Sequence, residues 1–427
     1  MRLLNTTTYE LCDNPQADGK YAEYAILSHR WRNQEITYAT LDSRALHNGT
    51  LENASARKVV AACARARQQG LDWIWIDSVC INKGDSAELS EALNTMLKWY
   101  RQAKVCYTYL DDVVARATKP DRNTFKSCLP ERVARGADSE WFERGWTLQE
   151  LVTPRHLEFL DREGQFIGTK HDLAGIVSVI TGIDAVYLIG KAQVRDTSVA
   201  TRMSWQSARI TTRVQDLAYS MLGLFGVFLN PTYSEGMNAF RRLQYAIIEQ
   251  SDDESIFAWK SANLPKPFQP KQWSEGEWGL FPPSPACFLD SGMCHVKGPC
   301  KRRAGGYKLT QQGLEFPVYI RQAGHLVAAD CPVPSRFEFA STLSLTIGQY
   351  RPVDLKVVVG TFLRVSLNCW QLCHEGYIFL PAIVVSKDPL ILKRLRCDSL
   401  WLGKTRNLTA SCYWDAISLQ PKEDDGV

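Results

Sequence analysis

Apolar residues in the first 110 positions alternate between short continuous runs and longer stretches with helical spacing. Continuous runs at 24–28, 73–76 and 104–110 are typical of buried strands. Between them, apolar side chains recur at helical spacing over 56–69 and over 85–103, which predicts two amphipathic helices. Strands and helices that alternate in this way predict a parallel sheet covered by helices, an α/β fold.

The same two patterns continue to about residue 250. A polar stretch over 111–137 predicts a long loop, and an apolar run over 156–160 predicts a fourth strand. Helical spacing predicts further helices at 139–152, 171–182, 212–226 and 234–250. Pro154 ends the first of these, because proline cannot continue a helix.

The composition and the hydrophobic pattern of the chain change past residue 255. Glycine and proline become frequent there, and apolar residues alternate with polar ones, for example over 314–320, 343–347 and 362–367. Alternation with a period of two residues is typical of half-buried strands. We therefore predict an α/β domain over 1–254 and a β-rich C-terminal domain over 255–427.

The composition of the chain is that of a globular protein and argues against a nucleic-acid partner and a membrane span. The chain has 427 residues, of which 45% are hydrophobic and 22% charged, as in an ordinary globular protein of more than one domain. The formal net charge is +4 and basic residues form no long run, so we expect no nucleic-acid partner. Neither about 18 consecutive apolar residues nor the apolar core of a signal peptide is present. We therefore expect a cytoplasmic protein without a membrane span.

Cysteine and histidine are scattered, and no CxxC pair occurs among the 13 cysteines. Two groups lack the paired spacing typical of zinc sites: Cys369, Cys373 and His374, and Cys287, Cys294, His295 and Cys300. We therefore predict no metal. The sequence also lacks a glycine-rich phosphate loop, a dinucleotide fingerprint, and the GxSxG and HExxH motifs. We expect that no cofactor is required.

Four segments carry long motifs. They are YAILSHRW at 24–31, WIDSVCIN at 75–82, WFERGWTLQEL at 141–151, and RMSW at 202–205 with TTRVQDLAY at 211–219. In their order and spacing, these segments resemble the fungal heterokaryon incompatibility (HET) domain family. The resemblance covers roughly residues 20–260, and Asn82 stands where many members have aspartate. It implies an effector of fungal nonself recognition and programmed cell death.

A more distant resemblance concerns chemistry. Three pieces are similar in order to those of a TIR domain: a strand that runs into Ser28-His-Arg30, a strand that ends at Asp77, and Ser139-Glu-Trp141 followed by Gln149-Glu-Leu151. The resemblance implies a TIR-like, flavodoxin-like core over about 20–165, extended by helices. In TIR enzymes the glutamate of the later helix is the catalytic residue that cleaves NAD. This role falls here on Glu150, although the spacing is longer, with Phe142 to Thr147 either inserted or shifted in register.

Glu150 is therefore the predicted catalytic residue. An N-glycosidic bond breaks through an oxocarbenium-like transition state, and one carboxylate near the ribose can stabilise its charge. The alternative is a buried glutamate that pairs with Arg144 or Arg30 and fixes the helix. The residues alone leave both interpretations open.

Residues near the strand ends are predicted to line one nucleotide-sized pocket around this glutamate. Ser28, His29 and Arg30 follow the first strand and Asp77 follows the second. Ligands of open α/β sheets bind at the carboxyl ends of the strands. His29 and Arg30 have the donors to hold a pyrophosphate. In the alternative, Ser28 caps the next element and Arg30 pairs with Asp77.

Four further residues are candidates for ligand contact. Cys80 and Asn82 lie in the loop after the second strand, and Trp31 and Trp146 can stack on a base or a nicotinamide ring. A nucleophilic pair of Cys80 and His29 is conceivable, but no third group that would orient the pair is evident. Core packing is the alternative role for both tryptophans.

Together these expectations describe a HET-domain effector that cleaves the N-glycosidic bond of NAD(P), with NAD(P) as substrate. Whether the chain is an enzyme stays open at this point. One alternative is a non-enzymatic signalling module that acts by self-assembly, and another is an enzyme of specialised metabolism that acts on a different small molecule. We expect a homo-oligomer with a nucleotide ligand and a protein partner or sensor.

Overall fold

The computed structural model describes residues 1–260 except 18, 52, 116–119 and 252, residues 281–296, and strands between 308 and 419. The chain divides into two compact units. The first comprises Met1–Asp196 and Arg209–Ala239, and the second comprises Thr197–Ala208 and Phe240–Val427. The predicted domain limits stay predictions.

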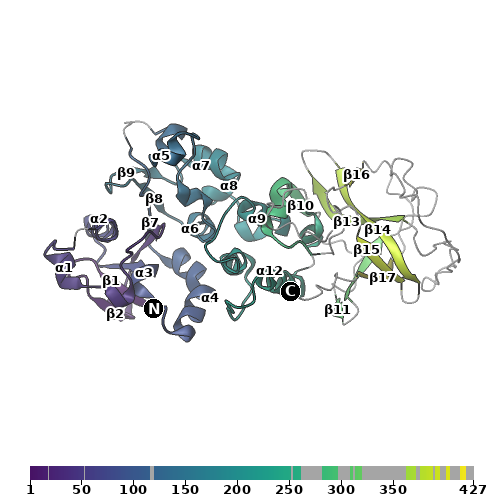
Figure 1. Ribbon diagram of the computed structural model, residues 1–427, viewed down its shortest axis with the longest axis horizontal. Coiled ribbons are helices and arrows are strands. Elements are labelled where there is room, and N and C mark those ends of the chain that lie inside the picture. Colours follow the sequence, from purple (N-terminus) through teal and green to yellow (C-terminus); the bar gives the residue numbers. More distant parts are fainter. Residues whose placement is uncertain are drawn as a thin grey trace. The chain divides into compact units, whose positions relative to one another are not determined.

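A seven-stranded sheet forms the core of the first unit (Figure 1). Its strands are β1 (Arg2–Asn5), β2 (Leu11–Asp13), β5 (Ala25–His29), β6 (Trp73–Ile76), β7 (Val105–Tyr109), β8 (Leu157–Leu160) and β9 (Phe166–Thr169). Their order in space is β2-β1-β6-β5-β7-β8-β9. β5 pairs in parallel with β6 and β7, and β7 pairs in parallel with β8. The predicted α/β fold is confirmed, and the sequence patterns missed the antiparallel additions β1, β2 and β9.

The four parallel strands define where a ligand would approach the sheet. Numbered along the chain, they stand in the order 2-1-3-4. The connections β5 to β6 and β6 to β7 run in opposite directions, so right-handed crossovers place α2 (Ala54–Gln68) and α4 (Ser86–Gln102) on opposite faces (Figure 1). A topological switch point therefore lies between β5 and β7, and open α/β sheets bind ligands at such points. The TIR-like assignment stays a prediction.

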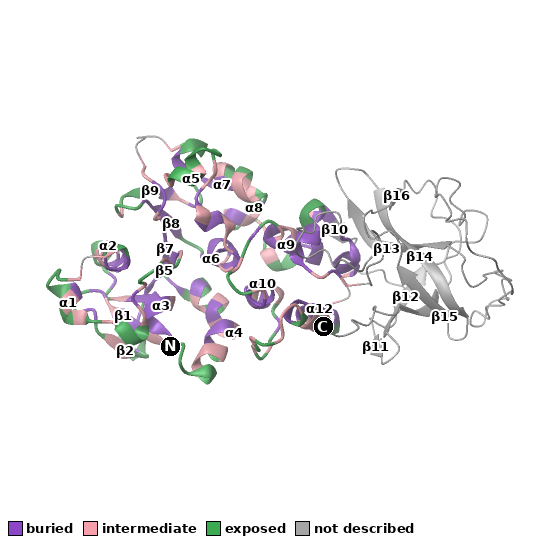
Figure 2. Ribbon diagram, viewed as in Figure 1, coloured by how far each residue is buried: buried purple, intermediate pink, exposed green. Residues whose placement is uncertain are grey.

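Burial agrees with this architecture. Every residue of β5 and β7 is buried, as expected of central parallel strands covered on both faces (Figure 2). Trp75 of β6 packs edge-on against Tyr100 of α4, with ring centroids 6.0 Å apart. The predicted strands at 24–28, 73–76, 104–110 and 156–160 are confirmed to within one residue at each end.

The predicted continuous helix over 139–152 is wrong. A 3-10 helix, η3 (Glu140–Glu143), is followed by a break and then by α6 (Thr147–Val152). The break occurs because Arg144 is extended and forms a β-bridge with Ile210, whose carbonyl oxygen accepts a hydrogen bond of 2.9 Å from the N–H of Gly145. All residues of α6 are buried as a result of this redirection.

The remaining helices are mostly short. The α-helices are α1 (Ser43–His47), α3 (Asp77–Cys80), α5 (Pro130–Val133), α7 (Ala174–Thr181), α8 (Ala185–Leu188), α9 (Val199–Gln206), α10 (Asp216–Tyr219), α11 (Leu222–Phe225) and α12 (Asn238–Gln250). The 3-10 helices are η1 (Tyr38–Thr40), η2 (Arg122–Phe125), η4 (Val194–Asp196), η5 (Glu254–Phe257) and η8 (Pro285–Ser291). The predicted helix over 212–226 is thus two helices, and the predicted loop over 111–137 contains η2 and α5. Within the described residues, no helix has the length and apolarity needed to cross a membrane.

The second unit contains an eight-stranded sheet with the order β10-β13-β14-β15-β17-β12-β11, and β16 pairs with β14. The strands are β10 (Cys294–Val296), β11 (Lys308–Thr310), β12 (Gly313–Tyr319), β13 (Phe362–Gln371), β14 (Gly376–Lys387), β15 (Leu390–Arg394), β16 (Trp401–Gly403) and β17 (Trp414–Leu419). In the first unit, β3 (Gln16–Ala17) and β4 (Lys20–Tyr21) form a separate two-stranded sheet. The predicted strand over 343–347 lies outside the described residues. A separate β-rich domain stays a prediction.

Candidate functional site

A serine and a glutamate that lie far apart in the sequence meet at the carboxyl edge of the central strand. Ser28 is the penultimate residue of β5 and is fully buried, and Glu150 of α6 is 7% exposed. The hydroxyl of Ser28 donates a hydrogen bond to Oε2 of Glu150. The indole N–H of Trp141 donates to the same Ser28 oxygen at 2.9 Å. The three side chains form one buried polar chain beside the switch point between β5 and β7.

Polar contacts fix the N-terminal end of the short helix that carries Glu150. At its N-terminus, Thr147 Oγ1 donates to the carbonyl oxygen of Trp141 at 2.6 Å. Arg209 then donates to Thr147 Oγ1 at 2.9 Å and to the carbonyl oxygen of Arg144 at 2.8 Å. A helix of six residues is too short to be stable by itself. The position of α6 therefore depends on these buried hydrogen bonds.

The surroundings of Glu150 favour its neutral form. Burial, which has the largest effect, and the charge of the nearby Asp77 together raise the pKa of Glu150 to about 8. The hydrogen bond from Ser28, a hydrogen bond from Tyr100 and the charge of Arg209 oppose this rise. Burial also lowers the pKa of Arg209 to about 9, while Glu150 raises it. The carboxyl group is thus poised to change its charge near neutral pH, which is a common property of catalytic acids and bases.

His29 belongs to a second buried cluster. Successive strand residues point to opposite faces, so His29 faces away from Ser28. Its Nε2 lies 3.4 Å from Glu35 Oε1 and 3.7 Å from Asp77 Oδ1. Lys58 of α2 pairs with Glu35 at 2.7 Å, and both side chains are almost fully buried. Burial raises the pKa of Glu35, but contacts with His29 and Lys58 exceed this effect and leave it well below its usual value.

Asp77 connects this cluster to the surface. Its carboxylate accepts hydrogen bonds from the indole N–H of Trp31 at 3.0 and 3.1 Å and pairs with Lys83 at 3.4 Å. Burial opposes ionisation of Asp77, but Lys83, His29 and Trp31 together lower its pKa. The Lys83 ammonium lies 3.4 Å from the centre of the Trp31 ring, in a cation–π contact. Trp31 itself is 37% exposed and so presents an aromatic surface at this edge.

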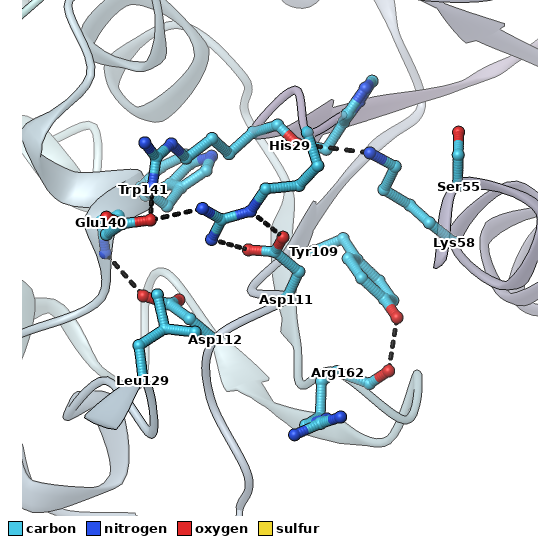
Figure 3. A network of polar contacts seen from close by, with 12 residues as sticks. His29, Ser55, Lys58, Tyr109, Asp111, Asp112, Leu129, Glu140, Trp141 and Arg162 are labelled. Carbon is cyan, nitrogen blue, oxygen red and sulfur yellow. Dashed lines mark hydrogen bonds and ion pairs between the residues drawn. The ribbon is translucent and has the colours of Figure 1, made fainter. Parts of the chain in front are cut away.

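Arg30 and Arg32 share one carboxylate at the same end of the sheet (Figure 3). Both guanidinium groups contact Oε2 of Glu140, and Arg32 pairs with Asp111 as well. Asp112, beside them, accepts hydrogen bonds from Ser139 Oγ at 2.5 Å and from the N–H of Glu140 at 2.9 Å. Arg30 therefore pairs with Glu140, and not with the two acids that the sequence suggested, Asp77 and Glu150.

Comparisons with known proteins agree with the motifs at this site. Residues 24–150 match the family described as "Heterokaryon incompatibility protein (HET)". This match identifies residues 24–150 as a HET domain. The matched span runs from the residue before β5 to Glu150 itself and therefore includes both ends of the Ser28–Glu150 contact.

One curated relative supports the assignment to the HET domain. The chain is 38% identical over 238 residues to "Vegetative incompatibility protein HET-E-1" of Podospora anserina. The match takes in 54% of this chain but only 16% of that protein. Residues 238–281 match a domain of unknown function, DUF8212. No solved structure matches the chain.

Three of the predicted pocket residues have partners away from Glu150. Cys80 is buried, and its Sγ accepts a hydrogen bond from the N–H of Ile76 at 3.4 Å. Burial raises the pKa of Cys80 to about 12, which makes this thiol a poor nucleophile. The side-chain oxygen of Asn82 accepts a hydrogen bond of 3.1 Å from the N–H of Gly84. Trp146 is half-buried and donates to Asp216. Their role in ligand contact stays a prediction.

Several residues that shape the site of the HET domain were absent from the sequence-based prediction. Trp141 lies inside a recognised motif, so its position next to the serine had a sequence signal. Tyr100 lies on the apolar face of the helix predicted over 85–103, whereas Glu35, Lys58 and Arg209 had no signal, because each enters the site through tertiary packing. Within the described residues, no group of three His, Cys, Asp or Glu side chains could hold a metal ion.

Proposed function

We propose that this HET domain is an effector of fungal nonself recognition and programmed cell death that cleaves the N-glycosidic bond of NAD(P). The similarity to a vegetative incompatibility protein supports the biological part of this proposal. The chemical part is carried by one observation, the hydrogen bond between Ser28 and Glu150 at the carboxyl end of β5. We place the activity in the cytoplasm and expect that a protein partner or self-association controls it.

The position of this contact supports a ligand-binding role. Open α/β sheets bind ligands at the switch point outside the carboxyl ends of their strands. The Ser28–Glu150 contact lies there, and the charge of Asp77, which accepts a hydrogen bond from the indole of Trp31, acts on Glu150. Glu150 accepts a hydrogen bond from the neutral hydroxyl of Ser28, and the charge of Arg209 also acts on it.

The chemistry needs a single negative charge. When the bond between the ribose carbon and the nicotinamide nitrogen breaks, its electron pair stays on nicotinamide, which leaves as a neutral base. The positive charge moves to the ribose, and ionised Glu150 would stabilise it until water adds and loses a proton. No proton has to be given to the leaving group. The cationic nicotinamide ring would lower the pKa of Glu150 on binding, because an opposite charge favours the ionised carboxyl group.

The other residues receive supporting roles in this proposal. The exposed ring of Trp31 can stack on a base, and Asp77, which lies 3.7 Å from His29, joins this ring to the buried cluster. Arg30 and Arg32 have the charge to hold a pyrophosphate. Since both now contact Glu140, a pyrophosphate would have to replace that carboxylate as their partner.

A direct assay tests the proposal. The purified full-length chain is mixed with NAD or NADP, and the release of nicotinamide is followed by chromatography. We expect release by the wild type and a loss of at least about a hundredfold in Glu150→Gln, a typical effect of removing a charge-stabilising group. Glu91→Gln is the matched control, because Glu91 is exposed on α4.

The outcomes separate the alternatives. If wild type and Glu150→Gln are equally inert, even when light scattering shows an assembled protein, the proposed cleavage is wrong. Assembly without turnover would favour a signalling module. Binding of a small molecule that lacks a ribose would favour an enzyme with a different substrate.

A further inference from the structure

The hydrogen bonds around Ser28 have a direction. An indole N–H can only donate, so the Ser28 oxygen acts as acceptor toward Trp141. The hydroxyl hydrogen is then available to the carboxylate of Glu150, with which Ser28 makes its other side-chain contact. A carboxylate that accepts such a bond is stabilised in its ionised form. Burial has the opposite effect on Glu150, as described above.

We propose that Trp141 is a positioning residue for Glu150, which acts by holding the Ser28 hydroxyl in the orientation that donates to the carboxylate. The proposal rests on the proposed role of Glu150 in the reaction. It adds a residue that touches neither substrate nor reacting atoms and that sets the charge of the catalytic group through a neighbour.

The packing of Trp141 suits this task. The ring is 1% exposed and lies edge-on to Phe142, with centroids 5.1 Å apart, and to Phe159 of β8, with centroids 6.1 Å apart. Two perpendicular aromatic contacts restrict rotation of the indole. Because the ring is already held by these contacts, its N–H points at Ser28, and the hydrogen bond costs less side-chain entropy than one from a flexible donor.

Other groups also act on the charge of Glu150 and must be kept constant in a test. They come from α4, the start of α3, β7 and the segments around α6, and are in that order Tyr100, Asp77, Cys106, and Arg144 with Arg209. The indole N–H donates to Ser28, so its removal acts on Glu150 through the hydrogen bond between Ser28 and Glu150.

The test measures ionisation directly and requires no turnover. The pH midpoint of Glu150 is followed by infrared spectroscopy of the carboxylic-acid C=O band, which is assigned by its absence in Glu150→Gln. In Trp141→Phe the hydroxyl is free to rotate, so we expect the midpoint to rise by roughly 0.5–1 pH unit. Phe159→Leu is the matched control, because it removes a ring contact of Trp141 but keeps the N–H. We expect little shift in this control.

A double-mutant cycle keeps the proposal testable if Trp141→Phe also loosens the core. Ser28→Ala should raise the midpoint by itself, and Trp141→Phe should then add nothing in the Ser28→Ala background. Equal shifts in Trp141→Phe and Phe159→Leu, no shift in Trp141→Phe, or additive shifts in the double mutant would each overturn the proposal. If NAD cleavage fails but these shifts appear, the proposed substrate is wrong and the positioning role stands.

Discussion

The ammonium group of Lys170 lies at the C-terminal end of the helix that carries Glu150. Its Nζ donates to the carbonyl oxygen of Leu151 at 3.0 Å and to that of Pro154 at 2.7 Å, and the side chain is buried. The last carbonyl groups of a helix have no partner within the helix, and a cation also interacts favourably with that end of the helix dipole. Lys170 thus completes α6 at the end opposite to Thr147.

Replacement of this lysine should destabilise the first unit. Lys170→Met leaves two buried carbonyl oxygens without their donor, and we expect a loss of roughly 2–4 kcal/mol in the free energy of unfolding. Urea denaturation measures this loss. Lys104→Met is the control, because Lys104 forms an exposed pair with Glu23, and it should change stability by less than about 1 kcal/mol. Equal effects of the two substitutions would contradict the assigned role.

The same lysine should give a recognisable pH dependence. Burial lowers the pKa of Lys170 from 10.5 to about 8, so between these values the folded state binds fewer protons than the unfolded state. Stability contributed by this group therefore rises with pH across that window. The difference in stability between wild type and Lys170→Met should grow from pH 8 to pH 10.5. A constant difference would mean that the ammonium is not hindered by burial.

Glu150 should give a stability that falls, and does not rise, with pH, and this change should occur at lower pH. Its pKa is raised from 4.5 to about 8, so between these values the folded state binds more protons than the unfolded state. The stability that the protonated carboxyl group contributes is complete below pH 4.5 and falls as the pH rises to about 8. We expect Glu150→Gln to gain stability relative to wild type across this window, by an amount on the order of a few kcal/mol. Thermal unfolding at a series of pH values measures it, and parallel curves would refute the raised pKa.

The carboxylate of Glu140 should stabilise the fold, because it offsets the repulsion between two neighbouring guanidinium groups. Without this carboxylate, the guanidinium groups of Arg30 and Arg32 lie close together and lose the anion that they share. Glu140→Gln should therefore destabilise by roughly 1–3 kcal/mol, and added salt should reduce the loss because it screens like charges. Glu163→Gln, which breaks an exposed pair with Arg162, should have almost no effect. A loss that salt does not change would point to packing instead of charge.

Two helical glycines should respond in opposite ways to alanine. A Cβ atom on Gly223 of α11 would lie 2.4 Å from Cβ of Leu97 on α4, whereas one on Gly175 of α7 would meet nothing within 4 Å. Gly223→Ala should thus destabilise by roughly 1–3 kcal/mol through overpacking. Gly175→Ala should stabilise by up to about 1 kcal/mol through helix propensity. Calorimetric melting temperatures that move in the same direction would show that the contact between α11 and α4 is wrong.

Local patterns predicted the elements that hold the site better than they predicted its contacts. The run before Ser28 and the run before Asp77 are buried strands, as their apolar residues indicated. The helix that carries Glu150 was predicted too long, because its periodicity says nothing of Ile210, which pairs with Arg144 and interrupts the helix. Arg30 was expected to hold a pyrophosphate, with a pair to Asp77 or Glu150 as the alternative, and it pairs with Glu140, one of several acids that spacing could not rank.

The sequence by itself determined the alternation of strands and helices, and its motifs indicated the family of the domain and the candidate glutamate. These follow from periodic burial and from residues adjacent in the chain. Only the tertiary structure decided that Ser28, Trp141 and Glu150 form one directed chain of hydrogen bonds, with Lys170 and Arg209 bracing the helix from outside it. Hydrogen bonds require donor and acceptor within about 3 Å. Which side chains come that close is set by how strands and helices pack, and no local pattern records it.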